Sequence, residues 1–153
     1  MKKFKKGFTL IELLVVIGII AILAAIVIIA INPARQFAQA RNTQRQSNIE
    51  TILNAIGQNL ADNKGVTNCP AVGSGTASST IGTSVVSPAI GVDLGGCLAP
   101  YISAGIPMDP TGGTSQDTKY QISVDSTGRY LVCAPNSLET GTLNLTSAFC
   151  LKR

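Results

Sequence analysis

Side chains able to carry out chemistry are few in this chain of 153 residues, and histidine is absent from it. Without histidine the chain has no His-ligated metal site and no Ser-His or Cys-His pair to activate a nucleophile. The phosphate-binding pattern G-x-x-x-x-G-K-[ST] is also missing from the sequence. The sequence therefore indicates a protein that is not an enzyme and that uses no cofactor.

The four cysteines are the most reactive side chains, and no two of them form a C-x-x-C pair. This spacing argues against a zinc site, and outside the cytoplasm four cysteines favour two disulfides. Three pairings are open. We favour Cys69–Cys97, which would close a long loop, and Cys133–Cys150, which would tie the last strand to a sheet.

Glu12 is an acidic residue next to a long apolar segment. From Leu13 to Ile31, nineteen residues carry no charged or strongly polar side chain. A carboxylate at the start of such a segment costs at least ~2.5–3.5 kcal/mol in membrane insertion, unless it reaches the membrane surface. The next cation along the chain is Arg35, so we expect the partner of Glu12 to come from outside this segment.

The apolar segment has the length of a membrane-spanning helix, because nineteen residues at ~1.5 Å give roughly 28 Å. A cleaved secretory signal would have a shorter apolar core and a small-residue site, which residues 28–32 do not supply. Four lysines lie among the first six residues, and the other side chains balance at eight positive and eight negative. We expect a single-pass precursor in the cytoplasmic membrane, with this basic end in the cytoplasm.

The sequence KKGFTLIE at residues 5–12 resembles the class III leader junction of type IV pilins and pseudopilins. The resemblance implies that a membrane peptidase cuts after Gly7 and methylates the new amino terminus at Phe8. It also makes Glu12 the fifth mature residue, the position of the acidic residue of the family. Glu12 of one subunit would then meet the Phe8 ammonium of a neighbour, a pair that fixes axial register more than it adds stability.

The sequence predicts an α+β fold, in which a long N-terminal helix packs on a small head with a three-stranded antiparallel sheet. The expected parts are a cleaved leader (1–7), a hydrophobic helix (8–31), an amphipathic helix (32–64), a loop region (65–117) and the sheet head (118–153). Gly18 weakens the first half of the helix. Asn32 and Pro33 suit an N-cap and a first helical position, which predicts a kink or a restart.

The second half of the helix carries an apolar stripe against which we expect the head to pack. The stripe consists of Ile49, Ile52, Leu53, Ile56 and Leu60. The other faces are expected to carry Arg41, Gln44, Arg45, Asn48 and Asn59. We interpret the arginines at 35, 41 and 45 as a solvated surface facing other subunits, with lipid headgroups and nucleic acid as the alternatives.

In the head, residues 119–125 alternate like a strand, and residues 125–128 form a short turn before a partner strand at 129–134. A third strand is expected around Leu143, Leu145 and Phe149, and a helical turn over residues 98–103. Asp109, Asp117 and Asp125 could supply oxygen ligands for calcium, as the resemblance to pseudopilin heads implies. The acidic C-terminal calcium loop of those heads has no clear counterpart in this sequence, so we expect no metal site. Asn144 begins a formal glycosylation sequon.

We interpret the chain as a prepilin whose product is a structural subunit of an extracellular type IV pilus, a homo-oligomeric helical filament. The resemblance implies roles in adhesion and motility, with a prepilin peptidase, an assembly ATPase and a platform protein as separate chains. One alternative is a pseudopilin of a type II secretion or DNA-uptake fibre, although a neutral mature chain argues against strong nucleic-acid binding. Another is a monomeric, membrane-anchored binding module outside the cytoplasm.

Overall fold

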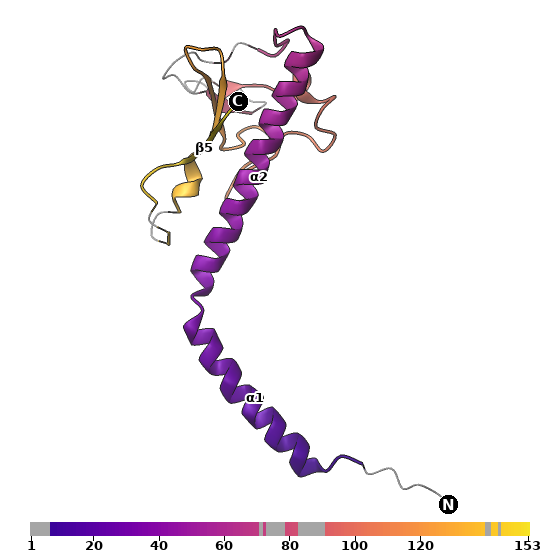
Figure 1. Ribbon diagram of the computed structural model, residues 1–153, viewed down its shortest axis with the longest axis vertical. Helices are drawn as coiled ribbons and strands as arrows, with labels where there is room; N and C mark the ends of the chain where they lie inside the picture. Colours follow the sequence, from indigo (N-terminus) through magenta and orange to yellow (C-terminus); the bar gives the residue numbers. More distant parts are fainter. Residues whose placement is uncertain (1–6, 71, 73–78, 83–90, 140–141, 144) are drawn as a thin grey trace, which may run out of the picture. The chain divides into compact units, whose positions relative to one another are not determined.

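The computed structural model describes residues 7–70, 72, 79–82, 91–139, 142–143 and 145–153 (Figure 1). The chain divides into two compact units, Met1–Phe37 and Ala38–Arg153. The first unit holds helix α1 (Leu10–Ala30), and helix α2 (Pro33–Asp62) begins in the first unit and continues through the second.

After Glu12 in its first turn, helix α1 is apolar around its whole circumference, and none of its 21 residues is buried. Among the described residues it is the one helix that is long and apolar enough to cross a membrane. Gly18 lies inside α1, and the helix continues through it without a break. The predicted weak point at Gly18 therefore does not interrupt the helix in this structure.

Helix α2 restarts after a break at residues 31–32, where the sequence predicts a kink or restart. The Asn32 side-chain oxygen accepts a hydrogen bond from the Arg35 backbone N–H at 3.2 Å, so Asn32 caps the new helix. At the other end, the Gly65 N–H donates to the Leu60 carbonyl at 2.7 Å. Gly65 has a φ of +88°, the left-handed conformation that commonly ends a helix.

The described residues of the head form five strands, whereas the sequence predicts three. They are β1 (Ser79–Ile81), β2 (Gly91–Val92), β3 (Gln121–Val124), β4 (Tyr130–Ala134) and β5 (Phe149–Lys152). Their order is β2-β1-β3-β4-β5, and β1 and β2 pair in parallel while the other neighbours are antiparallel. β1 and β2 were missed because strands of two or three residues are too short for alternation to reveal them.

One further prediction about the head was wrong in position. The last strand begins at Phe149, whereas Leu143 lies in a turn in which its N–H donates to the Glu139 carbonyl at 3.0 Å. Local backbone hydrogen bonds decide this element, and apolar spacing does not report them. The short helix α3 covers Gly95–Leu98, and the helical turn predicted over residues 98–103 follows it, with the Ile102 N–H donating to the Leu98 carbonyl at 3.0 Å.

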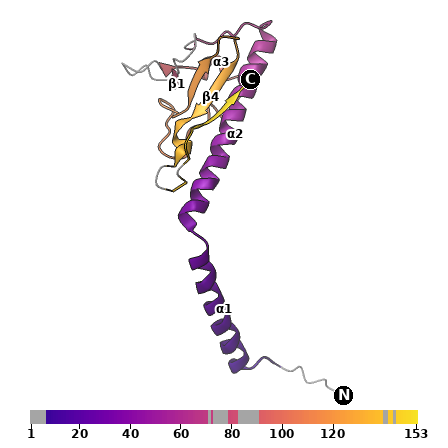
Figure 2. The same ribbon diagram turned by 60° about the vertical axis from the view of Figure 1, so that its left-hand side comes forward.

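The core lies between α2 and the sheet, and it uses the predicted stripe. Ile49 and Ile52 are fully buried, Leu53 and Ile56 nearly so, and Leu60 packs at the edge. Opposite them are buried side chains of the sheet and of the connecting loop, including Ile81, Leu98, Tyr120, Ile122 and Val132. Figure 2 shows the strands beside α2. The head therefore forms around this helix.

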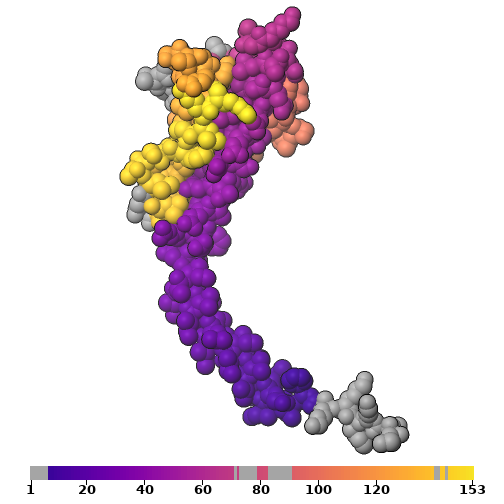
Figure 3. All heavy atoms as spheres, in the orientation of Figure 1, coloured from indigo at the N-terminus to yellow at the C-terminus, as the bar shows by residue number. Residues whose placement is uncertain are grey.

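Both disulfides favoured from the sequence are present, Cys69–Cys97 and Cys133–Cys150. The second joins directly opposed residues of β4 and β5, so it fixes the register of the last strand. In Figure 3 the C-terminal residues lie against α2, where the Arg153 guanidinium donates a hydrogen bond to the Asn54 side chain. The chain end is thus held to β4 by a disulfide and to α2 by a polar contact.

Candidate functional site

The leader junction continues directly into the start of α1. Thr9 caps the helix, and its Oγ1 accepts a hydrogen bond from the Glu12 backbone N–H at 3.3 Å. In return, the Thr9 backbone N–H and hydroxyl donate to Glu12 Oε2 at 2.9 and 2.7 Å. This reciprocal arrangement is a capping box, which the pattern T-x-x-E signals. Our sequence interpretation of Glu12 missed it.

The capping box leaves part of the Glu12 carboxylate open. Both described bonds to the side chain reach Oε2, and within the described part of the chain Oε1 has no hydrogen bond and Glu12 has no ion pair. One carboxylate oxygen can thus accept from a second donor while the cap stays intact. A cationic donor would make the stronger bond.

The bond between Gly7 and Phe8 lies before the helix, in a segment to which no helix or strand is assigned. Phe8 is 89% exposed, and no other heavy atom approaches within 4 Å of the space where a Cβ at Gly7 would lie. The junction is therefore sterically open in this structure. Cleavage there would turn the Phe8 amide nitrogen into a charged amine four residues before Glu12.

A second polar cluster, in the head, was not expected from the sequence. Arg45 is fully buried, and its guanidinium donates to Asp109 Oδ2 at 2.7 Å and Oδ1 at 3.2 Å. It also donates to Thr111 Oγ1 at 2.7 Å and Asn42 Oδ1 at 2.8 Å, and it pairs with Glu139. The prediction of a solvated Arg45 was wrong, because two loops supply carboxylates that fold over this face of α2.

Arg41 joins the same cluster from one helical turn away. Its Nε and Nη2 donate to Glu139 Oε1 and Oε2 at 2.9 and 2.7 Å, a bidentate pair. The bonds from Arg41, and then those from Arg45, outweigh burial and lower the pKa of Glu139 to about 2. At Asp109 burial favours the neutral acid, but the bonds from Arg45 and Thr111 prevail and lower its pKa.

The cluster attaches two distant loops to one helix. Asp109 begins a tight turn in which the Gly113 N–H donates to the Asp109 carbonyl at 3.1 Å. A Cβ at Gly113 would collide with the Asp109 backbone, so this turn requires glycine. Glu139 follows the short 3-10 helix η1 (Pro135–Leu138), inside the loop closed by the second disulfide. The signal in the sequence was two arginines four residues apart, which face the same way on a helix.

The three candidate calcium ligands are not brought together. Asp109 pairs with Arg45, Asp117 with Lys119, and Asp125 with Lys152. The Lys152 ammonium and the bonds from Thr127 and Arg129 lower the pKa of Asp125 at the β3–β4 turn. No group of three or more metal-binding side chains occurs among the residues described. Asn144 of the sequon lies outside them.

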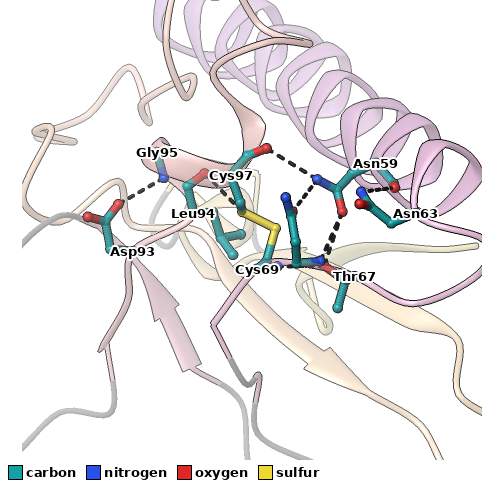
Figure 4. Close-up of a disulfide and its surroundings, with 9 residues drawn as sticks. Asn59, Asn63, Thr67, Cys69, Asp93, Leu94, Gly95 and Cys97 are labelled. Carbon is teal, nitrogen blue, oxygen red and sulfur yellow. Dashed lines mark hydrogen bonds between the residues drawn. A yellow bond between two sulfur atoms is a disulfide. The ribbon is translucent and has the colours of Figure 1, made fainter.

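Asn59 was also expected on a polar face, but it is only 1% exposed. Its amide donates to Asn68 Oδ1 at 2.6 Å and to the Cys97 carbonyl at 3.2 Å (Figure 4). Its side-chain oxygen accepts from the Thr67 hydroxyl at 3.3 Å. Asn59 therefore connects α2 to both ends of the first disulfide, a role that residue type and helical spacing do not predict.

The Arg41–Arg45–Glu139 contacts predict acid sensitivity of the head. An unfolded glutamate with a pKa near 4.5 binds protons before the folded one, whose pKa is about 2. The stabilisation that Glu139 gives the folded head is therefore complete above pH 4.5. It is lost as the pH falls towards 2, and the free energy of unfolding then decreases by about 3 kcal/mol. Urea unfolding at pH 7 and at pH 2.5 measures the loss. Glu139→Gln should reduce this pH dependence, and an unchanged dependence would contradict the assignment.

The comparison with known proteins gives a match within the unit Met1–Phe37. Residues 2–31 match the family described as the prokaryotic N-terminal methylation motif. No curated protein and no solved structure gives a significant match to the chain. The matched range contains the open Gly7–Phe8 junction, the Thr9–Glu12 capping box and the whole of α1. The matched residues carry the class III prepilin leader motif of type IV pilins and pseudopilins, and this motif supports a pilin- or pseudopilin-like subunit of a secreted filament.

Proposed function

We propose that this chain is the precursor of a structural subunit of a type IV pilus or a pilus-like filament. The leader is removed after Gly7, Phe8 is N-methylated, and α1 becomes the contact between subunits. The observation that carries the proposal is the methylation motif over residues 2–31, which includes helix α1 and its complete lack of buried residues. A helix that is apolar on every face has no stable place in water and requires lipid or other copies of itself.

Moving α1 from the membrane into a filament then exposes little apolar surface to water. Lipid tails and neighbouring α1 helices are equally apolar surroundings, so packing and polar contacts decide where the helix resides. A head-to-tail contact of this kind does not close on itself and therefore extends into a filament. The proposed starting state is a membrane-spanning precursor with its basic N-terminus in the cytoplasm. The proposed final state is the assembled filament at the cell surface.

Glu12 supplies the register of the proposed filament. Removal of the leader creates an ammonium at Phe8, and Glu12 Oε1 is open to a donor while Oε2 stays in the capping box. The ammonium of one copy can meet the carboxylate of the next only at one axial offset. At that offset the ammonium and the carboxylate neutralise each other in apolar surroundings. At any other offset both charges remain uncompensated.

Other chains must supply the work of assembly. The proposal requires a prepilin peptidase that cuts and methylates, an ATPase that provides energy and a platform protein in the membrane. The described head adds two disulfides and a buried ionic cluster. Such cross-links suit a domain that works outside the cytoplasm.

Mass spectrometry of sheared surface filaments tests the proposal. We expect a chain of 146 residues, because seven of 153 are removed, with N-methyl-Phe8 as its first residue and both disulfides intact. Membrane fractions from cells without the assembly ATPase serve as the control and should contain the processed subunit but no filaments. A chain that keeps residues 1–7 and stays single in the membrane would contradict the proposal and favour a membrane-anchored binding module.

A further inference from the structure

The segment after α1 combines a backbone break with two unusual side chains. Figure 1 shows the helical ribbon interrupted between α1 and α2. Phe37, four residues into α2, is 66% exposed although it is large and apolar. The Arg35 guanidinium has no hydrogen bond or ion pair to any described residue. All of these residues belong to the unit Met1–Phe37.

The length of α1 decides where this segment lies when the helix spans a membrane. Its 21 residues extend for about 31 Å, which matches the hydrocarbon thickness of a bilayer. A break in the helix leaves backbone groups without partners, and such groups are not tolerated in contact with lipid tails. The break at residues 31–32 therefore belongs at the membrane surface, where water and headgroups satisfy the backbone.

We propose that residues 31–37 form a membrane-surface anchor for anionic phospholipids. The Arg35 guanidinium binds the phosphate of an anionic headgroup, for which its planar set of donors is well suited. The Phe37 ring enters the boundary between headgroups and acyl chains, where aromatic side chains are favourable. The anchor fixes the depth of α1 in the bilayer. It rests on α1 as a membrane span and not on the filament proposed above.

The charge of Arg35 and its position just after α1 favour a lipid headgroup over a protein as its partner. The four leader lysines lie at the opposite end of α1 and are removed by cleavage after Gly7 in the proposed maturation. Arg35 then remains as the first cationic side chain of the chain, five residues beyond the end of α1. An arginine near the surface of an anionic leaflet binds that surface about fivefold more strongly than a neutral side chain.

The test uses Phe37→Trp, because the chain has no tryptophan and the variant carries a single indole. The full chain is placed in vesicles of equal parts phosphatidylglycerol and phosphatidylcholine, with one lipid or the other brominated. We expect brominated phosphatidylglycerol to quench the indole about fivefold more effectively than brominated phosphatidylcholine. Arg35→Gln in the same background should bring this ratio close to one, and Arg35→Lys should largely keep it.

Gln44→Trp provides the matched control. Gln44 is exposed, and it lies two turns further along the same face of α2. Its indole should be quenched by aqueous acrylamide and not by brominated lipid. A Phe37→Trp indole that responds like this control, or a ratio unchanged by Arg35→Gln, would overturn the anchor. So would an indole that is exposed in vesicles and shielded only in filaments, which would assign residue 37 to a contact between copies.

Discussion

Glu12→Val is expected to leave membrane insertion and leader cleavage intact and to reduce the yield of sheared filaments at least tenfold. Valine suits the apolar helix, so the span itself gains by the exchange. The loss falls on assembly, where the Phe8 ammonium of a neighbouring copy remains uncompensated. Removing one partner of a buried ion pair costs ~3–5 kcal/mol, and each ~1.4 kcal/mol is tenfold in an equilibrium.

Glu12→Gln separates this role from helix capping. Glutamine at the third helical position completes a capping box as glutamate does, but it cannot neutralise an ammonium. If the only role of Glu12 were the pair of bonds with Thr9 at 2.9 and 2.7 Å, Glu12→Gln would assemble normally. We expect it to fail almost as severely as Glu12→Val.

Thr9→Val is the complementary control, because it removes the capping hydroxyl and keeps the charge. Loss of an N-cap costs ~1 kcal/mol of helix stability, which should reduce filament yield only slightly. Quantifying sheared filaments and total processed subunit for all three variants gives the comparison. Normal filaments from Glu12→Gln, with poor filaments from Thr9→Val, would identify capping and not charge pairing as the role of Glu12.

Features that depend on long, regular patterns could be predicted from the sequence. The apolar run gave α1, and the five apolar positions from Ile49 to Leu60 gave the side of α2 on which the core forms. The break at Asn32 and Pro33 followed from local backbone chemistry. Cys133 and Cys150 could be placed because a predicted strand pair brought them together, as β4 and β5 do.

Features that depend on contacts between distant segments could not be predicted. Arg45 lies 64 residues from Asp109 and 94 from Glu139, and nothing in α2 alone indicates that carboxylates cover it. The strands β1 and β2 are likewise defined by pairing with each other and with β3. At the leader junction, the T-x-x-E pattern does signal a capping box. Glu12 was interpreted only as a charge in need of a partner, because it stands next to an apolar segment.

Arg45→Ala is expected to lower the free energy of unfolding of the head by ~3–5 kcal/mol, because it leaves a buried carboxylate without its counter-ion. The side chains of Arg45 and Asp109 both have 0% exposure, so water cannot replace the lost bonds. A loss of this size is a large part of the ~5–15 kcal/mol that stabilises a typical domain. Urea unfolding of the full chain in detergent, with both disulfides intact and followed by circular dichroism, measures it.

Two further variants distinguish ionic pairing from loss of volume. Arg35→Ala removes an arginine of the same helix whose guanidinium has no partner among the described residues, and it should change the stability of the head by less than ~0.5 kcal/mol. Arg45→Met combined with Asp109→Asn fills the space without a buried charge, and it should recover part of the stability lost in Arg45→Ala. If Arg45→Met alone were as stable as the unmodified protein, Asp109 would not depend on Arg45. The cluster would then be a consequence of the way the loops fold over α2 and not the contact that holds them there.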